Sequence, residues 1–269
     1  PAINYGSFAL DDGVYTLDSH EKNELIEIDQ RCESFIKPFI GAKELIQGGE
    51  RYCIWLKSEE DYLKIPVLKK RVEHVRSWRL ASKREATVKL ARTPHEFAEI
   101  RQPNTGYMAF PTISSERRKY IPARFYSSES IASHQVYIIP NAQLWNFAIL
   151  SSTMHMIWIK SVGGRLKSDY RYSSAICYNT FPTPSLSDIK KGKLSKLALQ
   201  VLTVRESYPD RSLAKLYDPD KMPTDLARAH TELDNYVDSI YSTRELVSEE
   251  QRLGVLMNMY LKMTGGQNA

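Results

Sequence analysis

Polar and apolar residues alternate along residues 165–173, directly after the adjacent glycines Gly163 and Gly164. A two-residue period is typical of an extended strand, whose successive side chains point to opposite faces. One face of the predicted strand carries only ionic side chains: Lys167, Asp169 and Arg171. The other face is apolar or aromatic and is expected to pack into a core: Leu166, Tyr170 and Tyr172.

The rest of the chain up to residue 184 alternates between helical and extended patterns. Helices are expected over 19–32, 66–84 and 145–159, and strands over 35–40, 50–56, 107–111 and 136–139. The helix over 66–84 is rich in Lys and Arg, including Arg79, and we expect most of these side chains on its solvent-exposed face.

The composition changes after Phe181-Pro182-Thr183-Pro184, which suits a short linker. Beyond it, apolar residues recur at helical spacing over 193–205, 227–241 and 248–263. We therefore predict an α+β protein, with a mixed α/β domain over 1–184 and a small all-α helical domain over 185–269.

The composition is that of a globular protein, with 42% hydrophobic and 26% charged residues among 269. No apolar run reaches the ~18 residues of a membrane span, and no leader precedes a cleavage site. The three cysteines are far apart and lack metal-ligand spacing, which favours reduced thiols in a cytoplasmic protein: Cys32, Cys53 and Cys177. Because the chain starts at Pro1 and moves straight into strand-like sequence, we expect a segment of a longer protein.

Positive charge is concentrated in the middle of the chain. Between Ser114 and Arg171 eight basic residues face three acidic ones, and this excess of +5 equals the net charge of the whole chain. Aromatic residues such as Tyr120 and Tyr170 are interleaved with the basic ones. This combination is typical of surfaces that contact the phosphate backbone of nucleic acid.

The sequence lacks the short motifs of common catalytic and cofactor sites. It has no GxGxxG, no GxxxxGK[ST], no HExxH and no GxSxG, and no Asn-Pro-Pro-Tyr-like tetrapeptide. His155 lies in a strongly apolar stretch and is expected to be a core histidine. His230 and Asp234 stand one helical turn apart, but a paired or capped surface position is favoured over a metal site. We expect no catalytic, cofactor or metal site in this chain.

The ionic row at 167–171 allows two interpretations. Lys and Arg can donate to guanine O6 and N7, and Asp can accept from cytosine N4, so the row suits base pairs in the major groove of DNA. The alternative is a solvated edge strand whose charges discourage aggregation, and spacing alone favours that alternative.

A collinear series of short motifs resembles the MmeI-like, type IIL restriction-modification enzymes and their stand-alone methyltransferase relatives. The part that resembles their target-recognition region includes 39–41, Arg76 with Arg79 and Ser82, 99–103, 114–122, 154–156, 164–173 and 178–182. The part that resembles their helical C-terminal region includes 216–219, 222–223, 229–230 and 233–234.

The resemblance implies a parent enzyme that methylates adenine at N6 with S-adenosylmethionine and in some members carries a fused endonuclease. This chain would then be its sequence-selecting segment, not an enzyme itself, with double-stranded DNA and the upstream methyltransferase domain of the same polypeptide as partners and with no membrane. The alternative class is a protein-protein interaction module that docks onto a methyltransferase subunit.

The same resemblance assigns roles to individual residues. Base reading is expected from Lys167, Asp169 and Arg171, and from Gln135, which suits bidentate pairing with adenine. Contacts to the phosphate backbone are expected from Ser115, Arg117, Arg118, Lys119 and Arg165.

Overall fold

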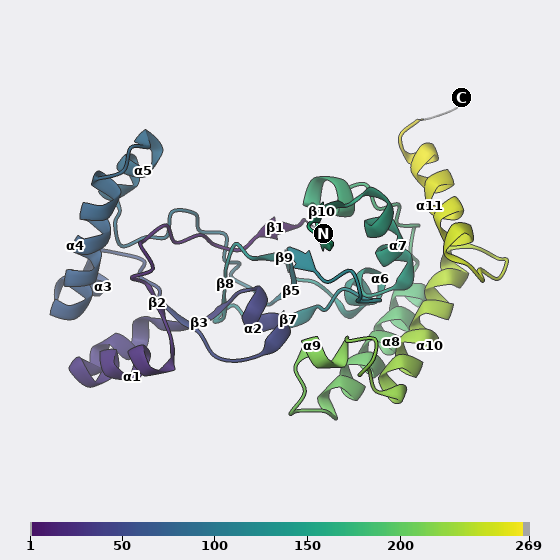
Figure 1. The fold of residues 1–269 in the computed structure, drawn as a ribbon, viewed down its shortest axis with the longest axis horizontal. Coiled ribbons are helices and arrows are strands. Elements are labelled where there is room, and N and C mark those ends of the chain that lie inside the picture. The colour runs from purple at the N-terminus through teal and green to yellow at the C-terminus, as the bar shows by residue number, and fades with distance from the viewer. Residues whose placement is uncertain (1, 266–269) are drawn as a thin grey trace.

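A computed structural model describes residues 2–265 and shows two lobes joined side by side (Figure 1). Each lobe has a hydrophobic core of its own. The first core is built from residues between Ala9 and Val75, together with Phe97 and Ile131. The second core extends from strands in the middle of the chain to the C-terminal helices.

The first lobe is organised around a four-stranded sheet of order β2-β4-β3-β8. Its strands are β2 (Thr16–Leu17), β3 (Ile36–Ile40), β4 (Tyr52–Ile54) and β8 (Ile131–Ala132). Its helical segments are α1 (Ser19–Ile28), η1 (Gln30–Phe35), α2 (Ala42–Gln47), α3 (Glu60–Leu63), α4 (Pro66–Leu80), α5 (Glu85–Lys89) and η2 (Leu90–Arg92). Leu45 of α2 packs into the second core, so α2 connects the two lobes.

Helix α4 buries an arginine on its apolar stripe. Leu68, Val72 and Val75 are fully buried, and Arg79, one turn further along the same stripe, is 0% exposed. Its guanidinium donates five hydrogen bonds of 2.9–3.1 Å, to the carbonyl oxygens of Ala9, Leu10, Leu90, Thr93 and Glu96. Burial lowers the pKa of Arg79. The expectation of a solvent-exposed position is therefore wrong for this residue, which ties two chain segments, 9–10 and 90–96, to the helix.

The second lobe contains an antiparallel sheet of order β1-β9-β5-β7. Its strands are β1 (Asn4–Tyr5), β5 (Tyr107–Pro111), β7 (Arg124–Tyr126) and β9 (Val136–Pro140). The helix predicted over 145–159 is instead two helices, α6 (Leu144–Leu150) and α7 (Thr153–Val162). The break occurs because the hydroxyl of Ser152 caps α7 by accepting from the amide of His155.

The C-terminal helices pack directly on the second lobe. They are α8 (Asp188–Glu206), α9 (Leu213–Leu216), α10 (Thr224–Tyr241) and α11 (Glu249–Met263). Leu194 and Leu233 of these helices share a core with Phe147 of α6, so the mixed α/β part is followed by a helical part, as predicted. No helix within residues 2–265 is both long and apolar enough to cross a membrane.

A buried polar contact joins the helical part to the rest of the chain. The carboxylate of Asp234 in α10 accepts hydrogen bonds from the Tyr120 hydroxyl (2.8 Å), the Thr153 amide (2.7 Å) and the Thr153 hydroxyl (2.6 Å). Burial raises the pKa of Asp234. His230 is fully buried, and the ring of Tyr120 stacks on it. Each residue has partners, Tyr120 and Thr153 for Asp234 and the Tyr217 hydroxyl for His230, but the predicted surface position is wrong for both.

Candidate nucleic-acid interface

The ionic segment forms a hairpin rather than one strand. Strands β10 (Gly164–Leu166) and β11 (Asp169–Arg171) pair antiparallel, with Arg165 opposite Tyr170 and Leu166 opposite Asp169. Lys167 and Ser168 form the two-residue loop between them. Lys167 has a φ of +56°, the left-handed conformation that such tight loops require. The prediction that Lys167, Asp169 and Arg171 share one strand is therefore wrong for Lys167.

The hairpin also changes which residues share a face. Residues directly opposite on paired strands point to the same side, so Leu166 lies on the outward face with Asp169 and Arg171. Leu166 is 48% exposed, whereas it was expected in the core. Tyr170 and Tyr172 are buried, as predicted, at 6% and 4% exposure.

The loop at the tip of the hairpin is held by Arg165. Its guanidinium lies over the ring of Tyr170 at 4.2 Å and donates a 2.7 Å hydrogen bond to the carbonyl of Ser168. It also lies 3.4 Å from the carboxylate of Glu116. Arg165 is therefore exposed at the surface, as a phosphate contact requires, but it is already oriented by three neighbours.

Strand β11 also pairs with β6 (Ile113–Ser114), which leads into the basic loop 115–119. The oxygens of Ser115 shape this loop, because its carbonyl accepts from the amide of Arg118 (3.1 Å) and its hydroxyl from the amide of Arg117 (3.4 Å). Arg117 is exposed and forms an ion pair with Asp220 of the C-terminal part. Lys119 is exposed.

Arg118 is the most enclosed of the four predicted cationic phosphate contacts. Its guanidinium donates a long hydrogen bond of 3.4 Å to the hydroxyl of Ser114, and its side chain is half-buried. Burial lowers the pKa of Arg118, while the nearby carboxylates of Asp169 and Asp218 oppose this shift. Arg118 therefore lies between the hairpin and the C-terminal part instead of projecting freely into solvent.

Gln135 is brought next to the hairpin by Thr112. Gln135 lies exposed in the turn between β8 and β9, and its carbonyl accepts from the amide (3.2 Å) and the hydroxyl (3.1 Å) of Thr112. The carbonyl of Thr112 in turn accepts from the amide of Tyr172, at 2.9 Å. The two predicted base-reading segments, far apart in sequence, thus lie on either side of one residue.

A neutral histidine contacts the residue that follows the hairpin, on the side that faces the core. His155 lies in the core, with Nδ1 2.8 Å from the Leu150 carbonyl and Nε2 3.1 Å from the Tyr172 hydroxyl. Because a carbonyl can only accept, Nδ1 carries the proton and Nε2 accepts from Tyr172. Burial lowers the pKa of His155 to about 4. His155 is a satisfied core residue, as predicted, and it fixes the end of β11.

The sequence did not point to three residues that organise this surface. Thr112 joins the two reading segments, while Glu116 and Asp220 hold Arg165 and Arg117. Each is a single common residue whose neighbours come from distant parts of the chain. Only Glu116, an acidic residue directly before three basic ones, could have suggested an internal ion pair.

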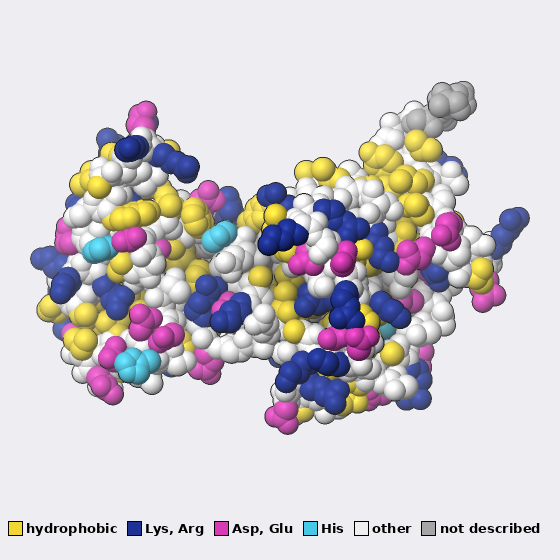
Figure 2. Space-filling model, viewed as in Figure 1, with side chains coloured by type: hydrophobic (Ala, Val, Ile, Leu, Met, Phe, Trp, Pro, Cys, Tyr) yellow, Lys and Arg dark blue, Asp and Glu magenta, His cyan; other side chains and the backbone are white. Residues whose placement is uncertain are grey.

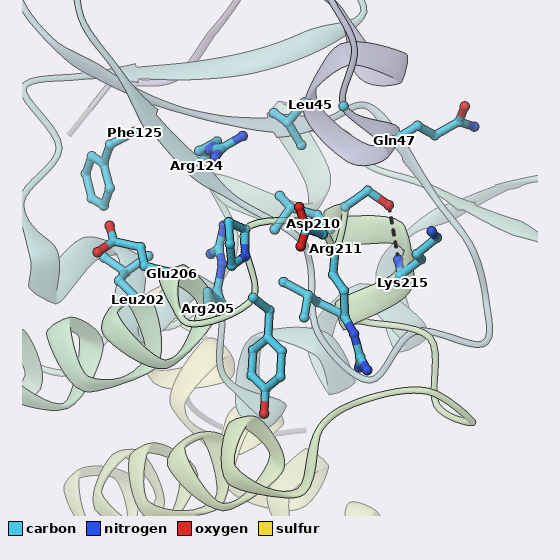
Figure 3. A pocket seen from close by; sticks show the side chains of 16 residues that line it. Leu45, Gln47, Arg124, Phe125, Leu202, Arg205, Glu206, Asp210, Arg211 and Lys215 are labelled. Atoms are coloured by element: carbon cyan, nitrogen blue, oxygen red, sulfur yellow. Dashed lines mark hydrogen bonds between the residues drawn. The ribbon is translucent and has the colours of Figure 1, made fainter.

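Basic side chains are prominent on one face of the second lobe. Figure 2 shows Lys and Arg gathered where Figure 1 places β10, and again over α9. A cavity of about 650 Å³ lies between α2, β7 and α8–α9. Figure 3 shows its side chains, which include Arg124, Arg205, Glu206, Asp210, Arg211 and Lys215. The guanidinium of Arg205 already donates a 2.9 Å hydrogen bond to the carbonyl of Ala123.

Known proteins resemble the chain along nearly its whole length. Residues 1–185 match the family described as "MmeI, target recognition domain", and residues 186–266 match "MmeI, C-terminal domain". DNA methyltransferase A of Bacillus subtilis (strain 168) is 38% identical over 267 residues, which cover 98% of this chain and 30% of that protein.

A solved structure has the same fold. The type IIL restriction-modification enzyme MmeI in complex with DNA superposes with a TM-score of 0.95 and 38% identity. The match covers 98% of this chain and 36% of that one. The chain therefore spans about a third of the length of each of these relatives.

Proposed function

Because this chain belongs to the MmeI family, with its target recognition and C-terminal domains, we propose that it selects the DNA sequence on which a methyltransferase acts. The observation that carries the proposal is the placement of hydrogen-bonding side chains on both sides of Thr112, of which Gln135 and Arg171 are exposed and Asp169 is half-buried. Gln135 stands on one side, and the hairpin with Asp169 and Arg171 on the other.

The chemistry of these side chains suits the edges of base pairs. Arg171 and Lys167 can donate to guanine, Asp169 can accept from cytosine N4, and Gln135 can pair bidentately with adenine. The major groove displays these groups in a pattern that differs for each base pair. Lys167 at the tip of a hairpin reaches further from the protein than a residue within a strand, so the hairpin can enter a groove.

The neighbouring cations suit contacts that fix register without reading sequence. Arg117 and Lys119 are exposed beside the hairpin, and Arg165 is exposed within it, so all three suit contacts to the phosphates that border the groove. Arg118 is half-buried, and we assign it to the inner side of the same surface. Ser115 serves mainly to shape the loop that presents these residues.

For the whole protein we propose a site-specific, S-adenosylmethionine-dependent DNA (adenine-N6) methyltransferase, in which an endonuclease is an optional further part. Catalysis and cofactor binding would belong to an upstream domain, and the present chain would hold double-stranded DNA while a base is rotated out of the stack. A cytoplasmic location and a domain boundary near residue 184 stay predictions.

Selection of duplexes from a randomised pool tests this proposal. The chain is incubated with the pool at moderate salt, bound duplexes are recovered and amplified, and the recovered sequences are aligned. We expect one short consensus to be enriched, with affinity that falls as salt rises. Recovery of unenriched sequence, or binding only to a methyltransferase domain and not to DNA, would favour the alternative of a protein interaction module.

A further inference from the structure

Three basic side chains of the C-terminal part line one hollow of about 340 Å³: Arg211, Lys215 and Lys221. All three residues are exposed. Within residues 2–265, neither Arg211 nor Lys215 has a carboxylate within ion-pair distance, and the Nζ of Lys221 is 3.8 Å from Asp218. The hollow thus presents positive charge that the protein itself neutralises only weakly.

A chain of contacts links this hollow to the basic loop beside the hairpin. Arg211 donates to the carbonyl of Lys221 (3.5 Å), and the adjacent residue Asp220 forms an ion pair with Arg117. On the other side of Arg117, Glu116 lies 3.4 Å from Arg165 of the hairpin. Figure 2 shows the Lys and Arg side chains over β10 and over α9 on the same face of the molecule.

The character of the hollow favours a polymer over a small anion. Its cations are at the ends of long, exposed side chains, and no buried polar group is aimed into it among the residues that line it. Such side chains suit electrostatic contact with a row of phosphates, because each contact releases condensed counterions from the duplex. A single small anion would gain little from donors that water screens.

We propose that the C-terminal domain grips the phosphate backbone of duplex DNA beyond the base pairs that the hairpin reads, through Arg211, Lys215 and Lys221. This inference rests on the proposed function of the chain. It extends the DNA-binding surface across the contact between the recognition and C-terminal parts, so that the C-terminal domain contributes affinity but no sequence information.

A triple variant tests the inference: Arg211→Gln, Lys215→Gln and Lys221→Gln in the full chain. The matched control removes three exposed charges from the first lobe: Lys69→Gln, Lys70→Gln and Lys83→Gln. Binding to a fluorescent random-sequence duplex of about 40 base pairs is measured at several salt concentrations. The slope of log affinity against log salt should become shallower by about 2 to 3 in the triple variant and change little in the control.

The outcomes separate this inference from the proposed function. If the unmodified chain shows no salt-dependent binding to the duplex, the proposed function itself fails. If the unmodified chain binds but the triple variant keeps its slope, or the control loses as much, the C-terminal domain does not grip the backbone. If the triple variant selects the same consensus sequence as the unmodified chain, the C-terminal domain contacts the backbone without reading the bases. An altered consensus would overturn this inference.

Discussion

The carbonyl oxygen of Gln135 accepts hydrogen bonds from both the amide and the hydroxyl of Thr112, at 3.2 and 3.1 Å. Replacing Thr112 with Val keeps the branched shape and the amide but removes the hydroxyl bond. We expect a loss of about 0.5–1.5 kcal/mol in the free energy of unfolding. Urea unfolding measures it, with Ser127→Ala as a control at another turn, and an unchanged midpoint would contradict the role of this hydroxyl.

The left-handed backbone of Lys167 predicts that glycine and alanine substitutions differ in stability but not in base discrimination. Glycine adopts a positive φ without strain, so Lys167→Gly should be more stable than Lys167→Ala by about 1 kcal/mol in urea unfolding. Both variants lose the ammonium, so each should lose about 1–3 kcal/mol of discrimination at the same base pair. Equal stability of the two variants would mean that the loop carries no strain.

The buried guanidinium of Arg79 should be essential for the first lobe. Arg79→Met leaves five carbonyl acceptors without a donor, and we expect a loss of about 3–5 kcal/mol in the free energy of unfolding. Arg79→Lys should be nearly as harmful, because an ammonium group cannot reach five acceptors. The control Lys70→Gln on the solvent-exposed face of α4 should change stability by less than about 0.5 kcal/mol. A mild effect of Arg79→Met would show that water replaces the guanidinium.

Two buried histidines predict instability in acid. Burial lowers the pKa of His155 to about 4 and that of His230 to about 3 in the folded chain. In the unfolded chain both regain a pKa near 6.5 and bind protons more readily, so their contribution to stability is present above pH 6.5. It is lost as pH falls from 6.5 toward 4, by about 1.4 kcal/mol per pH unit for each histidine.

Urea unfolding at pH 7, 6 and 5 measures this dependence. The variant His155→Gln removes one titrating group and should lower the slope of stability against pH by about 1.4 kcal/mol per pH unit, even if its stability at pH 7 is lower. Ser127→Ala removes no titrating group, so it offers a control that should leave the slope unchanged. A slope that is the same with and without His155→Gln would contradict the account.

Asp220 should compete with DNA for Arg117. The ion pair between them is exposed and therefore weak, so a phosphate can replace the carboxylate. Asp220→Asn should therefore tighten binding to random-sequence duplex a few-fold. In a chain that already carries Arg117→Gln, Asp220→Asn should have a smaller effect on binding. If the changes in binding free energy of the two substitutions simply add, Asp220 acts only through net charge.

The sequence predicted the helical and extended regions well where one pattern dominated. Tyr107–Pro111 and Val136–Pro140 are strands because continuous apolar runs suit buried strands, and the region after the Pro-rich linker is helical because its apolar residues recur at helical spacing. The sequence-based prediction failed where tertiary contacts determine the burial of a residue. Arg79 continues an apolar stripe, but only five carbonyls from distant loops make its burial possible.

The candidate site shows the same limit. Residues 165–173 alternate as one strand would, and the loop at Lys167 and Ser168 lacks the Asn-Gly or Gly pair that marks most two-residue hairpins. Pairing of β11 with β6 and of Arg165 with the loop defines the hairpin, and neither contact can be read locally. The predicted base-reading and phosphate roles of the individual residues stay predictions.

The most direct test of base reading compares Arg171→Gln with Arg117→Gln on duplexes that carry each single substitution of the selected consensus. Arg171→Gln should cost about 1–3 kcal/mol at one base pair and relax the preference there, with the other positions unchanged. Arg117→Gln should weaken binding to every duplex alike and make the salt slope shallower by about 1. A uniform loss from Arg171→Gln, with every base preference intact, would contradict the claim that the hairpin reads DNA.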